Sequence, residues 1–232
     1  MKFSLVLTAG IAALLAFQAG CDPGSATEAE PAESGEQSVL SVAEDGATTI
    51  ITASLQSSLP EAQGDLTEQE KQGILLMREE EKMARDVYDT LAKSWGGRPF
   101  SNISKAETTH MAAMKVLIDR YGLEDPVGGN GPGKFQSARL QKIYDDLVKR
   151  GKTSLGAALS AGAEIEDLDI ADLMDLSSKT DKQDIKKVYE NLTRGSENHL
   201  RAFVSVLNRR TGDDYTPKYI TKEHFNRIIA GG

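Results

Sequence analysis

Residues 78–88 read REEEKMARDVY, a stretch with the periodicity of a helix that buries one face. Apolar side chains recur before and after it at intervals of three and four, which is the spacing of such a face. Glu81 falls on this face, whereas Glu79 and Glu80 belong to a charge run typical of a solvated surface. A buried acid needs a partner, so Glu81 is the first candidate for a functional residue. The face consists of Ile74, Met77, Glu81, Ala84, Tyr88, Leu91 and Trp95.

The same pattern occurs four times along the chain, and each time polar residues interrupt the apolar face. We therefore expect an all-α fold, a four-helix bundle with one polar layer inside it. A glycine- and proline-rich stretch, 122–133, predicts a long crossover between the second and third helices. The helices are expected over residues 66–96, 104–121, 154–176 and 181–208, with short accessory helices over 140–151 and 221–229. The interrupting polar residues are Glu81, Glu107, His110, Glu166, Asp169 and His199.

This set of side chains suggests a metal centre. Four buried carboxylates without counter-charge would cost more than the whole stability of a domain, and these faces supply no Lys or Arg at that depth. Two divalent cations would balance four carboxylates, and neutral imidazoles would complete the ligand shell without adding charge. Oxygen and nitrogen donors without thiolate suit iron or manganese, with zinc or copper as competitors. The residues thus predict two metal ions.

Each candidate also has a simpler structural interpretation. Glu107 follows Ser104 by three positions and could merely cap the start of a helix. A histidine on an apolar face is more often a hydrogen-bonded core residue than a ligand. The acids of the third helix lie in an acidic patch over residues 164–172 that could be surface. The coincidence of such residues on four separate helices favours the metal centre.

These motifs resemble those of the ferritin-like di-iron carboxylate proteins, which use inward glutamates and Glu-x-x-His pairs. Residues 81–88 are similar to the first-helix motif of rubrerythrin, a Glu with Ala, Arg and Tyr three, four and seven positions on. Residues 107–110 match the Glu-x-x-His of the second helix, while Glu166 and His199 fall at the third-helix and fourth-helix positions. More closely still, residues 66–210 resemble a prokaryotic family, domain of unknown function 2202. The shared stretches are REEEKMARDVY, FSNISKAETTHM, EIEDLDI and RGSENHLRAF.

The resemblance implies a ferritin-like four-helix bundle with a di-iron site, and ferrous ion oxidation or peroxide reduction if the site is redox-active. Ser196 stands where the second Glu-x-x-His pair would have its Glu, so Asp169 is expected to supply that carboxylate. The chain has one cysteine, which excludes a rubredoxin-like electron port and leaves the electron donor unknown. The alternative is a non-catalytic metal-binding or envelope interaction module. The side chains expected to orient the ligands are Ser196, Asn198, Arg85 and Asp86.

Residues 1–20 resemble a bacterial lipoprotein signal peptide. Lys2 precedes an apolar stretch, residues 5–17, which is too short to span a bilayer comfortably, and small residues lead to Cys21. Cys21 is therefore the expected lipidation site, which would anchor an exported protein to the membrane. Asp22 resembles the signal that keeps such proteins at the inner membrane, facing the periplasm of a Gram-negative cell. The alternative is a plain secretory signal.

The net charge is −8, from 27 basic and 35 acidic residues, and disfavours a nucleic-acid partner. From Cys21 to Glu70 the chain has 11 acids and no Lys or Arg. Residues 21–65 are therefore predicted to form an acidic disordered tether, apart from a β-prone stretch at 47–55. The bundle is assigned to residues 66–210 and a C-terminal extension with a short helix to 211–232. The sequence leaves a homodimer open.

Overall fold

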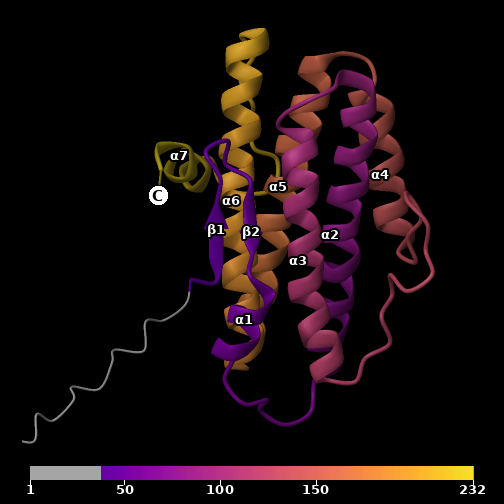
Figure 1. The fold of residues 1–232 in the computed structure, drawn as a ribbon, viewed down its shortest axis with the longest axis vertical. Coiled ribbons are helices and arrows are strands. Elements are labelled where there is room, and N and C mark those ends of the chain that lie inside the picture. Colours follow the sequence, from indigo (N-terminus) through magenta and orange to yellow (C-terminus); the bar gives the residue numbers. More distant parts are fainter. Residues whose placement is uncertain (1–37, 232) are drawn as a thin grey trace, which may run out of the picture. The chain divides into compact units, whose positions relative to one another are not determined.

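The computed structural model describes residues 38–231, within a compact unit formed by Gln37–Gly232. The predicted signal peptide, Cys21 and the first part of the predicted tether lie outside the described residues. None of the described helices is both long enough and apolar enough to cross a membrane. The elements, labelled in Figure 1, are β1 (Leu40–Val42), β2 (Thr48–Ile50), α1 (Thr52–Ser58), α2 (Glu68–Trp95), α3 (Phe100–Arg120), α4 (Ala138–Gly151), α5 (Leu155–Ser178), α6 (Gln183–Thr211) and α7 (Lys222–Ala230).

Four long helices form the main body, so the fold is mostly helical, as the sequence predicts. Helix α2 packs against α3, α5 packs against α6, and α2 also contacts α5. The long crossover after α3 leads into α4, which packs against α2 and α5 (Figure 1). The predicted accessory helices correspond to α4 and α7.

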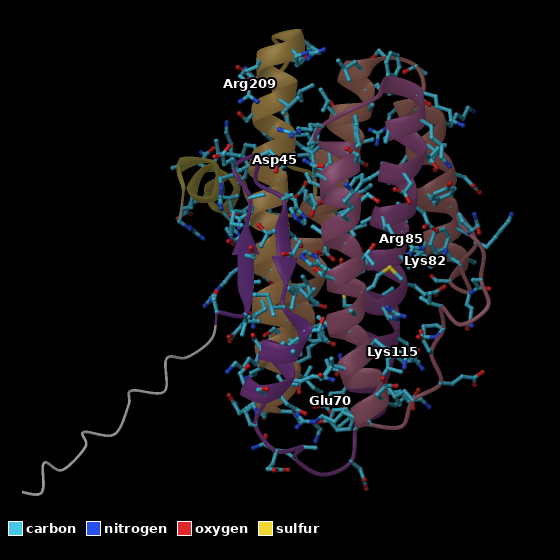
Figure 2. The ribbon with its side chains drawn as sticks, in the orientation of Figure 1. Asp45, Glu70, Lys82, Arg85, Lys115 and Arg209 are labelled. Atoms are coloured by element: carbon cyan, nitrogen blue, oxygen red, sulfur yellow. The ribbon has the colours of Figure 1, made fainter. Side chains whose placement is uncertain are left out.

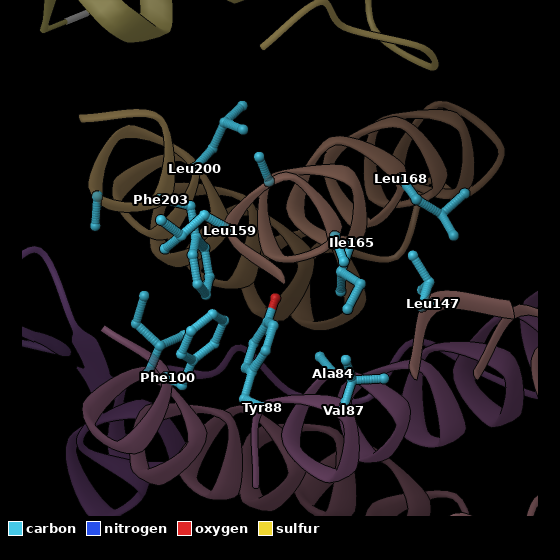
Figure 3. Packing of buried hydrophobic residues seen from close by; sticks show 14 of the residues in the cluster. Ala84, Val87, Tyr88, Phe100, Leu147, Leu159, Ile165, Leu168, Leu200 and Phe203 are labelled. Atoms are coloured by element: carbon cyan, nitrogen blue, oxygen red, sulfur yellow. The ribbon is translucent and has the colours of Figure 1, made fainter. Parts of the chain in front are cut away.

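Two apolar clusters fill the interior, and the polar residues of the sequence pattern lie between them along the helices. One cluster contains Tyr88, Phe100 and Phe203, whose rings pack at centroid distances of 5.0–5.6 Å (Figure 3). The other contains Met77 and Leu192, among others from the opposite half of the same helices. Because apolar packing continues on both sides, the polar layer between the clusters is shielded from water.

The helix starts explain one alternative left open by the sequence. Thr67 and Glu70 form the expected capping box of α2. Helix α3, however, begins at Phe100, with Pro99 at its N-cap, four positions before the predicted start. Ser104 therefore lies inside α3 and donates a hydrogen bond to Asp89. Glu107 cannot be a first-turn capping residue, so the capping interpretation is wrong.

The segment before the long helices differs from the sequence expectation, which extends a disordered tether to residue 65. Strands β1 and β2 form an antiparallel hairpin in which Leu40 pairs with Ile50 and Val42 with Thr48. Strand β2 lies against α3 and α6, and α1 lies against α3. The segment docks because its β-prone stretch, 47–55, buries Ile50 of β2 and Leu55 of α1.

Close packing of α5 on α6 generates a stability prediction. A β-carbon added at Gly162 would lie 2.5 Å from the ring of Phe203. Gly162→Ala is expected to lower the free energy of unfolding by about 1–3 kcal/mol, because the ring or the helix has to shift. Gly131→Ala is the matched control, since nothing lies within 4 Å of its added β-carbon. Urea denaturation gives both values, and equal stability of the two variants would contradict the packing.

Candidate metal centre

All six residues that the sequence singles out lie in the polar layer between the apolar clusters. None of them is more than 4% exposed to solvent. Four different helices bring them together, so the centre depends on the packing of the whole body. Helix α2 carries Glu81, α3 carries Glu107 and His110, α5 carries Glu166 and Asp169, and α6 carries His199.

Glu107 occupies the middle of the centre, with one carboxylate oxygen toward each imidazole. Its Oε2 lies 2.9 Å from Nδ1 of His110, and its Oε1 lies 2.9 Å from Nδ1 of His199. The same Nδ1 atoms also face the other glutamates: Nδ1 of His110 is 3.4 Å from Glu81, and Nδ1 of His199 is 3.6 Å from Glu166. The two rings stack with centroids 5.1 Å apart. The arrangement has carboxylates on both flanks and a shared one between the histidines.

Short distances in this centre do not amount to hydrogen bonds. Among the described residues, Nδ1 of both histidines has no partner with hydrogen-bond geometry, and the same holds for one oxygen each of Glu81, Glu107 and Asp169. Buried polar atoms without partners are rare and costly. Donor atoms of Glu107, His110 and His199 all lie within 4.8 Å of one another, so this group could hold a metal ion. Oxygen and nitrogen atoms that converge without hydrogen bonds to one another suit a cation better than a hydrogen-bond network.

The carboxyl groups are strongly perturbed. Burial raises the pKa of Glu81 to about 8, and burial together with the charge of Glu107 raises the pKa of Glu166 to about 7. Burial, followed by the charge of Glu81, also raises the pKa of Asp169 well above its usual value. Burial alone would raise the pKa of Glu107 too, but the two imidazoles hold it below its ordinary value. In the absence of a cation, the centre therefore balances its charge by keeping protons on several acids.

The backbone of Thr48 in β2 contacts both histidines from outside. Its carbonyl lies 3.0 Å from Nε2 of His110, and its N–H donates to Nε2 of His199 at 2.9 Å. A carbonyl can only accept, so His110 carries a proton on Nε2, and the neutral ring has its lone pair on Nδ1. An N–H can only donate, so the neutral ring of His199 has its proton on Nδ1. One peptide residue thus holds two neighbouring imidazoles in opposite tautomers.

His199 experiences opposing influences. Burial lowers its pKa, and the adjacent carboxylates of Glu107 and Glu166 raise that pKa to about 9. The N–H of Thr48 opposes the rise, because it needs an unprotonated Nε2. His110 meets no such conflict, since the Thr48 carbonyl accepts its Nε2 proton in either charge state. His110 is therefore the better prepared metal ligand of the two.

The structure places the predicted supporting side chains in two different surroundings. Ser196 donates to Asp169, and Asn198 donates to the hydroxyl of Thr48 at 2.9 Å, so one supports the centre and the other supports the hairpin. Arg85 and Asp86 are elsewhere. Asp86 pairs with Arg85 and with Lys82. Asp86 and Lys82 in turn bind backbone groups of the crossover loop, and Figure 2 labels Arg85 and Lys82 on α2.

Three contributors were not identified by the sequence analysis. Thr48 lies in a stretch recognised only as β-prone. Tyr88, which the sequence places on the buried face of its helix without a polar role, donates its hydroxyl to Glu166 at 2.5 Å. Gly195 allows α6 to approach His110, because an added β-carbon would lie 2.6 Å from that ring. Of these three, only Gly195 had a signal in the sequence, because it directly precedes Ser196 in the fourth-helix motif.

These observations define a class: a helical protein with a buried carboxylate–histidine centre. Residues 70–232 match the family model described as an uncharacterized protein domain, DUF2202, and the chain belongs to this family. It is 50% identical over 174 residues to the uncharacterized protein MJ0754 of Methanocaldococcus jannaschii, covering 75% of this chain and 92% of that protein. The crystal structure of hypothetical protein MJ0754 is similar, with a TM-score of 0.72 at 49% identity over 75% of this chain and 98% of that chain. The hairpin lies before the range matched by the family model.

The raised pKa values of Glu81 and Glu166 predict how the stability of the metal-free protein depends on pH. Both groups titrate near 4.5 when unperturbed, and in the folded protein they keep their protons up to about 8 and about 7. The folded state therefore holds more protons in this window, so their contribution is complete below pH 4.5 and is lost as pH rises through 7 and 8. In chelator, we expect the melting temperature to fall by several degrees between pH 5.5 and pH 8.5.

Glu81→Gln cannot ionise and should flatten this pH profile. Glu190→Gln removes an exposed carboxylate on α6 and should follow the wild type. Scanning calorimetry over the pH range provides the comparison. A melting temperature that rises with pH would show that the buried acids are not protonated in the folded protein.

The opposite tautomers can be measured directly by ¹⁵N NMR, because protonated and unprotonated ring nitrogens differ widely in chemical shift. In the metal-free protein, Nε2 of His110 should carry a proton and Nε2 of His199 should not. Thr48→Pro removes the backbone N–H and the hydroxyl but keeps the carbonyl, so it should change the signals of His199 and spare those of His110. Identical protonation of Nε2 in the two rings of the wild type would refute the role of Thr48.

Proposed function

We propose that the protein is a ferritin-like metal protein of the cell envelope that binds two divalent ions at the buried centre, with iron favoured over manganese or zinc. The observation that carries this proposal is the convergence of buried carboxylate and imidazole atoms that lack hydrogen-bond partners. Glu81, Glu107 and His110 would hold one ion. The second would lie toward Glu166, His199 and Asp169, and ligation by Nδ1 of His199 would require the proton to leave that nitrogen and Nε2 to give up its contact with the Thr48 N–H.

Charge balance supports the number of ions. Four carboxylates carry four negative charges when ionised, and two divalent cations neutralise them without help from the imidazoles. The raised pKa values mean that cations have to displace protons from Glu81, Glu166 and Asp169. Metal binding is therefore expected to release protons and to strengthen as pH rises.

The reaction that suits such a centre is ferrous ion oxidation coupled to peroxide reduction. Two ferrous ions supply the two electrons that, with two protons, convert one peroxide molecule into two waters. The chain's own groups position the ligands: Tyr88 donates to Glu166, and Ser196 donates to Asp169. The Thr48 carbonyl directs Nδ1 of His110 inward by accepting from Nε2.

A non-catalytic metal-binding module is the second candidate, and the burial of the centre favours it. Catalytic metal sites keep a coordination position open, whereas structural sites are closed. Every member of this centre is almost completely buried, and β2 covers the outer edge of both histidines. In this candidate the tautomer of His199 is retained, and a single ion binds through His110.

The location in the envelope is proposed from the sequence of the signal segment. Lipidation of Cys21 would attach the exported protein to the inner membrane, with the acidic segment as a spacer. No nucleic-acid partner is expected from the charge, and a homodimer and an unidentified electron donor complete the proposed assembly.

Metal content tests the proposal directly. The full chain, purified in detergent without a metal-affinity tag, is stripped with chelator, reloaded anaerobically with ferrous ion and measured by elemental mass spectrometry. We expect two ions per chain, reduced to one or none in Glu81→Gln and His110→Gln. Glu190→Gln should retain the wild-type content. One ion per chain would support the binding module, and none would reject both candidates.

A further inference from the structure

Glu80 is buried without a hydrogen-bond partner in the part of the chain that the structure describes, whereas each of its neighbours in the sequence has an assigned role. Its neighbour Glu79 accepts the backbone N–H groups of Gln136 and Ser137 at the start of α4. Glu80 is 1% exposed, and neither of its oxygens has a hydrogen-bond partner among the described residues. The interpretation of both residues as a solvated surface is wrong. A buried carboxyl group with two unsatisfied oxygens either keeps a proton or takes a cationic partner.

The charged groups around Glu80 form a row across α2 and α5. Asp172 on α5 acts on Glu80 most strongly after burial, followed by Arg139 on α4 and then Glu81. Glu80 in turn acts on Asp169, together with Glu81 and Glu166. Glu80 directly precedes Glu81 on α2, which contacts α5, and it interacts electrostatically with both Asp172 and Asp169 of that helix.

Asp169 continues the row inward. Its Oδ2 accepts from Ser196, while its Oδ1 has no partner among the described residues. Glu166, Asp169 and Asp172 follow one another at intervals of three along α5, which places them on one side of that helix. We call Asp172, Glu80 and Asp169 the acidic row.

Exposure falls along the acidic row from one end to the other. The side chain of Asp172 is 25% exposed and pairs with the half-exposed Arg139 at 2.9 Å. Glu80 and Asp169 are buried. The row thus starts at the surface, below an arginine of α4, and ends beside Glu81 and Glu166.

The opposite side of the centre is closed. Strand β2 lies between α3 and α6, and Thr48 occupies the outer nitrogens of both histidines. A cation that reached the centre from that side would have to displace the hairpin. The α2–α5 side offers carboxylates at successive depths instead.

We propose that the acidic row is the route by which divalent cations reach the buried centre, with Arg139 competing with the incoming cation for Asp172 at its outer end. This inference rests on the proposed metal binding. Carboxylate oxygens are suitable ligands for ferrous and manganous ions, and a lined-up set of negative charges raises the rate at which cations arrive. Glu80 holds no cation permanently, because the row does not bring three donor atoms within 4.8 Å of one another as the centre does.

Rates of metal uptake test the route separately from the capacity of the centre. Apo full-length protein in detergent is mixed with Co²⁺ in a stopped-flow instrument, and the visible absorbance of the bound ion is followed to completion. Glu80→Gln and Asp172→Asn should slow uptake roughly tenfold or more, with the same final number of ions per chain. Arg139→Gln should accelerate it. Added salt should reduce the wild-type rate and narrow these differences.

Two controls separate the route from other effects. Asp175→Asn removes an exposed carboxylate one turn further along α5, and its uptake rate should equal that of the wild type. Glu80→Asp keeps the charge and should retain most of the rate, while thermal melting confirms that each variant is folded. Unchanged uptake in Glu80→Gln would overturn the route, and so would a lower final metal content, because Glu80 would then be a ligand. Failure of the wild type to bind any cation would overturn the proposed function itself.

Discussion

Compensation of negative charge is the constraint on which the rest of this structure depends. Four carboxylates of the centre lie between two apolar clusters. The free-energy cost of burying their unbalanced charge there would exceed the free energy of unfolding of the fold. Protons on Glu81, Glu166 and Asp169 balance it in the metal-free protein, and cations can replace them. Two imidazoles on either side of Glu107 keep that residue ionised. Protons on these acids, and not a fixed hydrogen-bond network, therefore balance the charge of the centre, and a cation could take their place.

Docking of the hairpin imposes a second constraint, because it buries strand backbone against helices. One edge of β2 pairs with β1, and its other edge would leave buried N–H and C=O groups without partners. Side chains of α3 and α6 replace the missing strand: His110 and His199 bind Thr48, and Thr109 accepts the N–H of Ile50. Docking of the hairpin and orientation of the two imidazoles consequently depend on each other.

Periodicity sufficed to predict the long helices and the six residues that interrupt their faces, because both are encoded within single helices. It marked residues 47–55 only as β-prone and did not predict the hairpin, since β2 is short and its second edge gains its partners from helices more than fifty residues away. The same reason applies to Thr48, whose role lies in its backbone and leaves no trace in residue type. Glu80 was misassigned because a run of three glutamates looks solvated, and only the position of α4 and α5 buries it. Arg85 and Asp86 lie next to the motif in sequence but face the crossover loop.

The centre also divides into two parts with separate origins. Residues 70–232, which match the family model, supply every candidate ligand and the acidic row. The hairpin lies outside that range and supplies the proton arrangement of the histidines. In a relative without such a hairpin, both outer ring nitrogens would need other partners, and nothing would impose opposite tautomers. The helices therefore supply the groups that could hold a cation, whereas β2 sets the proton arrangement of the two histidines and covers one side of the centre.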